Sequence, residues 1–145
     1  MKRRTLVAAA AALSFTAALP ALAAEKGTQY VVLDKPLPNA EGTLIKVFSY
    51  DCPFCYKYDV GVDPRVLPRI EKEVGLKFKP MHLETKGTYG RCASVFLAMC
   101  MLRDEKAGVS IEDKNSLFKK AKDAIYNAYH RKQERWTAGE SAFLK

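Results

Sequence analysis

The stretch that decides the fold is LIKVFSYDCPFC, residues 44–55. Residues 44–49 form a nearly continuous apolar run, which is typical of a strand buried on both faces. A C-x-x-C motif, Cys52-Pro53-Phe54-Cys55, follows almost at once. Pro53 suits the first turn of a helix, where a missing N–H costs nothing. We expect this helix to continue to Val60 and to be broken by Gly61. The sequence therefore predicts two cysteines at a strand-to-helix junction.

This junction suits thiol–disulfide chemistry. The spacing lets Cys52 and Cys55 form a small disulfide ring, and the helix N-terminus offers free N–H groups and a positive dipole end to Cys52. Both features stabilise a thiolate, which is the attacking form of a thiol and the better leaving group. We interpret Cys52 as the nucleophilic and leaving sulfur, and Cys55, one turn deeper, as its buried partner.

The alternative is a structural disulfide or half of a zinc site. A zinc site needs two more ligands, and the candidates are His82, Cys92, Cys100 and His130. None of them forms a second C-x-x-C or a close H-x-H pair, so the redox interpretation is favoured and no metal is expected. Each histidine is expected to be structural.

Three neighbours of the cysteines are weaker candidates. Lys46 interrupts the apolar strand, and its ammonium would stabilise the Cys52 thiolate if that face lay beneath it; alternatively it snorkels to the surface. Asp51 abuts Cys52 and is expected to point to solvent; the alternative is that its charge raises the pKa of the Cys52 thiol. Phe54 offers only apolar contact surface.

The rest of the chain predicts a β-β-α-α-β order followed by helices. The further elements are a first strand at 30–33, a helix over 63–74 with Asp63 as N-cap and Gly75 as C-cap, a strand at 76–83, a helix after Gly87, and a helix capped by Ser116. We expect the first of the last two helices to present one face made of Cys92, Val95, Phe96, Met99, Cys100 and Leu102. For the second helix we expect an apolar stripe of Leu117, Ala121, Ala124, Ile125, Ala128 and Tyr129.

Cys92 and Cys100 lie eight residues apart on one predicted helix. A helical rise separates them by about 12 Å, which is beyond disulfide reach. We interpret them as small core thiols, with a bridge to another chain as the alternative.

Residues 1–23 have the layout of a secretory signal peptide. Lys2, Arg3 and Arg4 precede an apolar run, and Ala21-Leu22-Ala23 fits a small-x-small cleavage site. An uncleaved membrane anchor is the alternative, but the run is short for a bilayer span. Disulfides form and persist outside the cytoplasm, so export favours a redox role for the cysteines.

Composition limits the classes of protein. The chain has 145 residues, 48% of them hydrophobic, and a formal net charge of +8. These values exclude a disordered tail, and 28% charged residues exclude a polytopic membrane protein. The basic residues are spread along the chain, which argues against nucleic acid as a partner.

Several segments carry a resemblance to a known family. They are residues 29–30, 33–36 and 48–56 (FSYDCPFCY), and then TLIKVFSY (43–50), HLETKG (82–87), FKKAK (118–122), Tyr129-His130 and ERW (134–136). The first group resembles the periplasmic thiol:disulfide oxidoreductases of the DsbA type. The second group is similar to the DsbL branch of that family.

The resemblance implies an α/β thioredoxin fold with a helical insertion. It implies a signal peptide at 1–23, the N-terminal part of the thioredoxin-like domain at 24–86, and a partial insertion at 87–145. Family members continue further, and their cis-proline follows the insertion, whereas all seven prolines here lie at or before Pro80. We therefore expect a chain that is truncated, with the fold incomplete at the C-terminus.

The resemblance also implies a function: a periplasmic dithiol oxidase that introduces disulfides into exported proteins through Cys52 and Cys55, without a cofactor. The implied partners are reduced exported proteins, with an arylsulfate sulfotransferase as a candidate substrate, and a quinone-linked membrane reoxidase of the DsbB/DsbI kind. A disulfide reductase or isomerase, or an impaired fragment whose cysteines are structural or metal-binding, are the alternatives.

Overall fold

The computed structural model describes residues 24–145, which divide into two units, 24–36 and 37–145. The signal peptide expected at 1–23 lies outside the described residues. None of the helices within residues 24–145 is long and apolar enough to cross a membrane.

The unit of residues 24–36 is a short turn followed by extended chain. Its one ladder contact is an isolated bridge between Lys26 and Tyr30. The strand predicted at 30–33 is therefore wrong: the segment is exposed, and Val31 keeps 80% of its surface accessible. A β-branched run favours extended backbone, but a strand also needs a partner, and within the described residues only Tyr30 of this run has one, through that single bridge.

In the second unit, β1 (Thr43–Phe48) and β2 (Lys77–His82) form a parallel pair in which Phe48 lies opposite His82. Both predicted strands are confirmed. Burial of β1 on both faces is only partly observed, because Phe48 is 4% exposed but Val47 is half exposed. Pro80 lies inside β2, opposite Lys46, and is buried.

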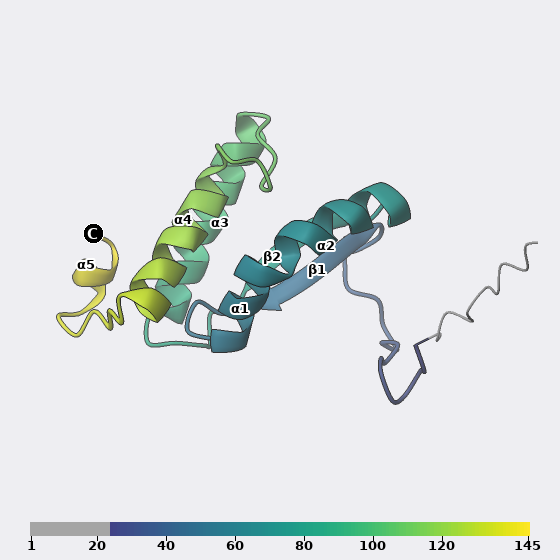
Figure 1. Cartoon of the computed structure of the whole chain (residues 1–145), viewed down its shortest axis with the longest axis horizontal. Helices are drawn as coiled ribbons and strands as arrows, with labels where there is room; N and C mark the ends of the chain where they lie inside the picture. The colour runs from purple at the N-terminus through teal and green to yellow at the C-terminus, as the bar shows by residue number, and fades with distance from the viewer. Residues whose placement is uncertain (1–23) are drawn as a thin grey trace, which may run out of the picture. The chain divides into compact units, whose positions relative to one another are not determined.

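The helices α1 (Pro53–Gly61) and α2 (Asp63–Arg69) and the π-helical turn η1 (Ile70–Val74) connect the two strands. A parallel pair needs such a crossover (Figure 1). Gly75 ends it in the left-handed region, at φ 76°, as predicted. Val62, one residue before the predicted Asp63, is the N-cap of α2, and Asp63 is the first helical residue.

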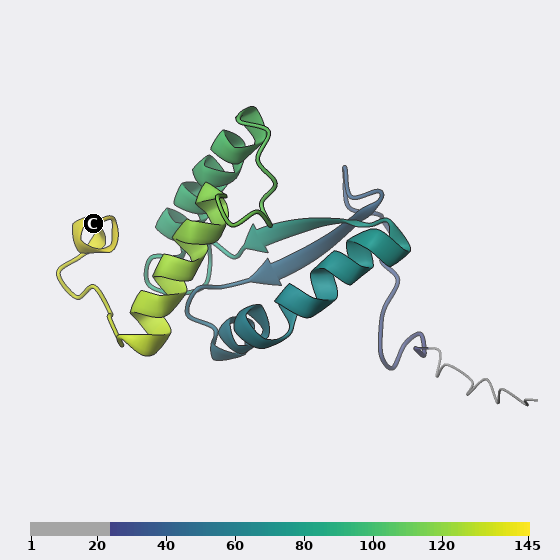
Figure 2. The ribbon, with the colours of Figure 1, turned by 45° about the horizontal axis from the view of Figure 1, so that its top comes forward.

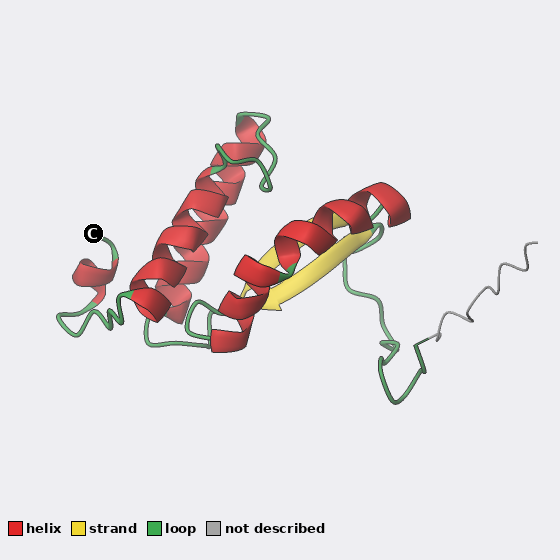
Figure 3. Ribbon diagram, in the orientation of Figure 1, coloured by secondary structure: helices red, strands yellow, loops and turns green. Residues whose placement is uncertain are grey.

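Beyond β2 the unit is helical (Figure 3), with α3 (Gly90–Lys106), α4 (Leu117–Tyr126), the π-helical turn η2 (Asn127–Arg131) and α5 (Glu140–Phe143). The two long helices confirm the predicted ones, whereas α5 was not expected. Helices α3 and α4 lie side by side, and both strand arrowheads point toward the pair (Figure 2).

The face predicted for α3 is wrong except at Cys100, whereas half of the stripe predicted for the second helix, Ala121, Ile125 and Tyr129, packs against the core cluster. The buried residues of α3 are Gly90, Ala93, Leu97, Cys100 and Asp104, while Val95, Phe96, Met99 and Leu102 are exposed. In α4 the buried residues are Phe118 and Tyr126, and Leu117 is exposed. Counting apolar residues favoured the wrong side of α3, because its buried face contains a glycine, an alanine and an aspartate.

The core joins the end of β1 to the helical pair. The Phe48 ring contacts Phe118 edge-on at 6.4 Å between centroids and Tyr126 at 6.2 Å. Leu97 and Ala93 fill the α3 side of the same cluster. Aromatic pairs at these separations contribute about 0.5–1.5 kcal/mol each beyond their buried area.

A buried carboxylate fixes the start of α4. Asp104 accepts hydrogen bonds from Ser116 Oγ (2.7 Å), Leu117 N (2.8 Å) and Phe118 N (2.9 Å). Ser116 Oγ accepts from Lys119 N at 2.9 Å, which confirms Ser116 as the predicted N-cap. Burial alone would raise the pKa of Asp104, but these hydrogen bonds outweigh it and lower that pKa.

We expect Asp104→Ala to lower the free energy of unfolding by about 2–3 kcal/mol, because it leaves buried donors at the start of α4 without an acceptor. Urea unfolding followed by circular dichroism measures the change. The matched control is Glu105→Ala, an exposed neighbour in the same helix, for which a change within about 0.5 kcal/mol is expected. Equal losses in the two variants would contradict this account.

Candidate active site

The candidate site begins with a turn at the end of β1. The last ladder contact is Leu83 N donating to Phe48 O at 2.9 Å, and Cys52 N then donates to Ser49 O at 3.2 Å. This second bond closes a four-residue turn, with Tyr50 and Asp51 as its central residues. The turn places Cys52 immediately before the first residue of α1.

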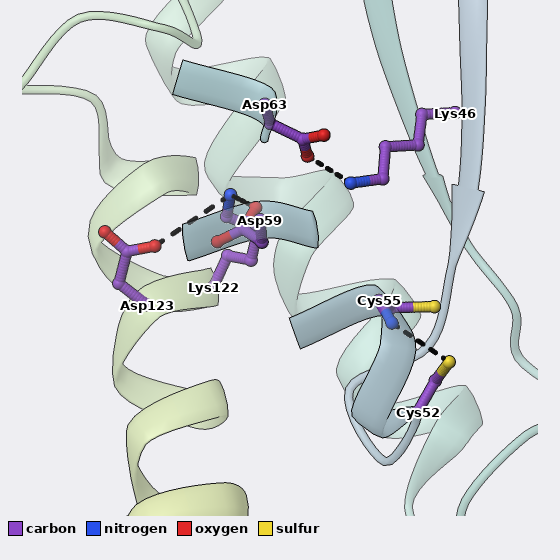
Figure 4. A network of polar contacts seen from close by, with 7 residues as sticks. All are labelled: Lys46, Cys52, Cys55, Asp59, Asp63, Lys122 and Asp123. Carbon is purple, nitrogen blue, oxygen red and sulfur yellow. Dashed lines mark hydrogen bonds and ion pairs between the residues drawn. The ribbon is translucent and has the colours of Figure 1, made fainter. Parts of the chain in front are cut away.

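Cys52 is the N-cap of α1. Its backbone is extended, with φ −79° and ψ 114°, and its sulfur accepts a hydrogen bond from Cys55 N at 3.2 Å (Figure 4). Its carbonyl accepts from Tyr56 N at 3.1 Å, and Pro53 stands in the first turn as predicted. The sulfur of Cys52 therefore lies at the helix N-terminus and accepts a hydrogen bond from a main-chain N–H there.

Cys55 lies one turn further and packs against the core cluster. It is half-buried, as Cys52 is, so it is less deeply buried than the sequence predicted. Burial raises the pKa of the Cys55 thiol, and the hydrogen bond and charge of Cys52 raise it further. Both cysteines are free thiols in this structure. The arrangement favours a protonated Cys55 beside a sulfur that accepts hydrogen bonds.

A hollow of about 360 Å³ opens beside the two sulfurs. It is lined by Val47, Phe48, Ser49, Asp51, Cys52, Pro53, Cys55, Leu83 and Lys86. Most of these side chains are apolar or small. Phe54 lies outside this lining and is 70% exposed, with the Lys57 ammonium 5.7 Å from its ring centre.

Lys46 is paired with a carboxylate. Its ammonium forms an ion pair with Asp63, at the start of α2, and only a quarter of the side chain is exposed (Figure 4). Neither expectation for Lys46 describes this contact. Its charge lowers the pKa of Cys55, but this effect is smaller than that of burial.

Asp51 differs from its prediction. The side chain is half-buried and accepts a hydrogen bond from Ser49 Oγ, so it does not simply point to solvent. Its charge lies close enough to His82 to raise the pKa of that ring, against the larger effect of burial.

A second, charged cavity of about 460 Å³ lies among β1, α1, α2 and α4. Lys122 of α4 forms ion pairs there with Asp59 of α1 and, at 3.9 Å, with Asp123 (Figure 4). Asp59 and Lys122 are 63 residues apart in sequence, so no local pattern could have joined them. The Lys122–Asp59 pair joins the helix that carries the cysteines to α4.

The two histidines bind the same residue. His82 Nε2 accepts from Tyr50 N at 3.1 Å, and His130 Nε2 lies 2.8 Å from Tyr50 O. Both are thus structural contacts, as expected, yet their common partner was not predicted. Among residues 24–145 there is no cluster of three or more His, Cys, Asp and Glu side chains placed to hold a metal.

Cys92 and Cys100 are free thiols in this structure, the first half-buried and the second buried. Cys100 is part of the core cluster, which confirms its interpretation as a core thiol. Burial raises the pKa of both thiols, and the nearby carboxylates Glu140 and Asp104 add to the effect at Cys92 and Cys100, respectively.

A C-x-x-C pair at the start of the helix that follows the first strand of a parallel β-α-β unit defines the thioredoxin-like class of protein. Comparison with known proteins supports this class. The chain is 54% identical over 142 residues to the thiol:disulfide interchange protein DsbL of Escherichia coli O6:H1, covering 97% of this chain and 61% of that protein. It is 52% identical to DsbL of Lelliottia amnigena, covering 99% of this chain and 63% of the relative.

Solved structures agree. The crystal structure of DsbL from Salmonella enterica serovar Typhimurium superposes with a TM-score of 0.73 and 53% identity, over 84% of this chain and 60% of that one. No family model matches the chain. The chain is a homologue of DsbL, a thiol:disulfide interchange protein, and has the expected thioredoxin-like fold. It spans less than two thirds of the length of the DsbL relatives.

We expect iodoacetamide to modify Cys52 before the other three cysteines at pH 7. The raised pKa of Cys55, Cys92 and Cys100 keeps these thiols protonated, and a protonated thiol reacts poorly. Substoichiometric alkylation followed by peptide mass mapping measures the order. Cys52→Ser should lose the fast phase, and a Cys55 peptide modified as fast as the Cys52 peptide would contradict the expectation.

We also expect acid to destabilise the fold through His82. Burial lowers the pKa of His82 to about 4, below the ordinary value of about 6.5 in an unfolded chain. The unfolded chain therefore binds a proton first as the pH falls from about 6.5 to 4, and the native state loses stability over that window. Since the ring is partly exposed, we expect a loss of about 1–2 kcal/mol.

Urea unfolding at pH 7 and pH 4.5 measures this loss of stability. The control is His82→Gln, which does not titrate in this range and should lack this contribution. Equal pH dependence in both proteins would refute the assignment.

Proposed function

We propose that this protein is a periplasmic disulfide oxidase that introduces disulfides into exported proteins at Cys52-Pro53-Phe54-Cys55. The observation that carries the proposal is the geometry of Cys52, an N-cap whose sulfur accepts the Cys55 N–H at 3.2 Å. Homology to proteins named thiol:disulfide interchange protein supports it.

The reaction begins with the oxidised Cys52–Cys55 pair. A substrate thiolate attacks Cys52 Sγ, the Cys52–Cys55 bond breaks, and Cys55 leaves with the electron pair and takes up a proton. A second substrate thiolate then attacks the substrate sulfur of the mixed disulfide and expels Cys52 as a thiolate. Two electrons have passed from the substrate thiols to the pair, and the substrate has gained one disulfide.

The two cysteines fit different steps. The raised pKa of Cys55 suits a sulfur that becomes protonated once it has left. The N–H donated to Cys52 stabilises the charge on the sulfur that leaves last. A stabilised reduced pair makes its disulfide a strong oxidant, so the geometry favours an oxidase over a reductase or isomerase.

The flanking residues have supporting roles in this proposal. Pro53 starts the helix without needing a hydrogen bond for its nitrogen and lines the hollow beside Cys52. Phe54 offers an exposed apolar ring to a substrate. Lys46 and Asp63 together hold α2 against β1, and the charge of Lys46 moderates the pKa of Cys55.

The partners proposed are those of the family. Reduced exported proteins supply the electrons, an arylsulfate sulfotransferase is the particular substrate that the DsbL resemblance implies, and a quinone-linked membrane protein of the DsbB/DsbI kind reoxidises the pair. Homology to DsbL supports the exported substrates and the membrane reoxidase in general terms. No resident cofactor is proposed.

A glutathione redox titration of the purified protein tests the proposal, read by alkylation and mass. We expect the Cys52–Cys55 pair to equilibrate as a unit at a potential more oxidising than the roughly −270 mV of thioredoxin. A more reducing midpoint would favour a reductase. Four thiols that react alike, with no defined midpoint, would refute the proposal for this chain.

A trapping experiment tests the separate roles of the two sulfurs. Cys55→Ser removes the resolving thiol, so we expect Cys52 to accumulate as a mixed disulfide after incubation with glutathione disulfide. Cys52→Ser is the matched variant, and it should form no comparable adduct at Cys55. Peptide mapping distinguishes adducts at Cys92 and Cys100, and an equal adduct at Cys55 would reverse the assignment.

A further inference from the structure

The polar main-chain groups of Tyr50 are both bound by imidazole rings. Tyr50 N donates to His82 Nε2 at 3.1 Å, and Tyr50 O accepts from His130 Nε2 at 2.8 Å. His82 is the last residue of β2, and His130 lies in η2. His82 and His130, which lie 32 and 80 positions away from Tyr50 in the sequence, therefore both bind this one residue of the turn that ends at Cys52.

These contacts require opposite tautomers. An N–H can only donate, so His82 Nε2 is the bare, accepting nitrogen and its proton lies on Nδ1, which is 2.8 Å from Ser94 Oγ. Ser94 Oγ in turn donates to His82 O at 3.3 Å. A carbonyl can only accept, so His130 carries its proton on Nε2.

The tyrosine side chain leaves the turn little freedom. Tyr50 is 2% exposed, and its hydroxyl accepts from Tyr89 N at 3.0 Å. A Cβ at Gly87 would come within 2.7 Å of the ring, so the backbone there lies directly against it. The His82 ring stacks on the Tyr50 ring, with centroids 5.7 Å apart and planes 4° apart.

His130 also contacts the helix that carries the cysteines. Its ring stacks on Tyr56 of α1, with centroids 4.8 Å apart and planes 5° apart. It therefore touches both the turn before Cys52 and the helix after Cys55. Ser49 O, at the start of the turn, accepts from Cys52 N, so a displacement of Tyr50 carries over to the position of Cys52.

We propose that His82 and His130 are positioning residues for Cys52: by binding Tyr50 N and O, the two imidazoles fix the turn that holds the Cys52 sulfur against the N-terminus of α1. This inference rests on the proposed function only in that Cys52 is taken as the attacking sulfur. Neither ring is assigned a contact with substrate.

The hydrogen bond of His82 depends on its protonation state. A second proton on Nε2 would turn the acceptor into a donor that faces the Tyr50 N–H. The groups that face this ring are Asp51 of the turn, Ser94 of α3, and the rings of Tyr50 and Phe48. Of these only Asp51 is charged at neutral pH, and its charge favours protonation. Burial lowers the pKa of the ring to about 4, so the ring is neutral at pH 7.

The test pairs a variant that removes each contact with one that preserves it. His82→Phe and His130→Phe keep an aromatic ring but have no ring nitrogen. In His82→Gln the amide oxygen can accept from Tyr50 N, and in His130→Gln the amide nitrogen can donate to Tyr50 O. Lys79→Gln, at an exposed position of the same strand as His82, is the control.

The readout is the rate of Cys52 alkylation by iodoacetamide between pH 4 and pH 9, with peptide mapping. We expect each Phe variant to react roughly ten-fold more slowly at pH 7, which is the effect of losing one hydrogen bond to a buried group, with the pH profile displaced upward. We expect each Gln variant to lie within about two-fold of wild type, as Lys79→Gln should. Phe variants that react like wild type would overturn the proposal, as would Gln variants as slow as the Phe variants.

A second measurement decides the matter if a Phe variant does not fold. Nitrogen-15 NMR of the histidine rings in the wild-type protein should find the Nδ1–H tautomer for His82 and the Nε2–H tautomer for His130 at pH 7. The reverse tautomer at either ring would overturn the proposal. The absence of a defined glutathione midpoint would instead count against the proposed oxidase, because the alkylation rates and tautomers do not depend on it.

Discussion

The rest of the structure depends on how one buried peptide segment satisfies its hydrogen bonds. Tyr50 leaves the β1–β2 ladder inside the core, where an unpaired N–H or C=O costs about 1–3 kcal/mol. Two imidazoles from distant parts of the chain supply the missing partners. His82 of β2 thereby connects the sheet to this turn, and His130 of η2 connects the helical pair to it. The direction in which α1 starts follows from the position of the turn.

The chemistry of the cysteines follows from that direction. Cys52 stands at a helix N-terminus because the turn ends there, and Cys55 faces the core because it lies one helical turn later. One sulfur then receives an N–H donor, while burial raises the pKa of the other. The difference between two identical side chains three residues apart comes from backbone geometry, and the surrounding charges, among them Lys46, act as smaller corrections.

Local sequence was sufficient to predict β1, β2, the long helices and the C-x-x-C motif. Apolar runs predicted β1 and β2, and single residues predicted where helices start or end: Pro53, Gly75 and Ser116. Each of these signals depends only on the few residues around it. The failures concern what an element packs against. Among the described residues, 30–33 favour extended backbone but pair only through the isolated bridge at Tyr30. Helix α3 buries its side with Ala93 and Asp104. The joint binding of Tyr50 by His82 and His130 could not be read from the sequence, because it depends on where three separate segments meet.

The aromatic cluster around Tyr50 also has an optical consequence. Trp136, the single tryptophan of the chain, meets the Tyr50 ring edge-on at 6.0 Å between centroids, and its carbonyl accepts a hydrogen bond from the Tyr89 hydroxyl at 2.6 Å. Tryptophan fluorescence therefore comes from a single ring, which contacts Tyr50, two residues before Cys52. The protein carries a built-in fluorophore next to its cysteine turn, and its emission reports on the packing of that turn without any added label.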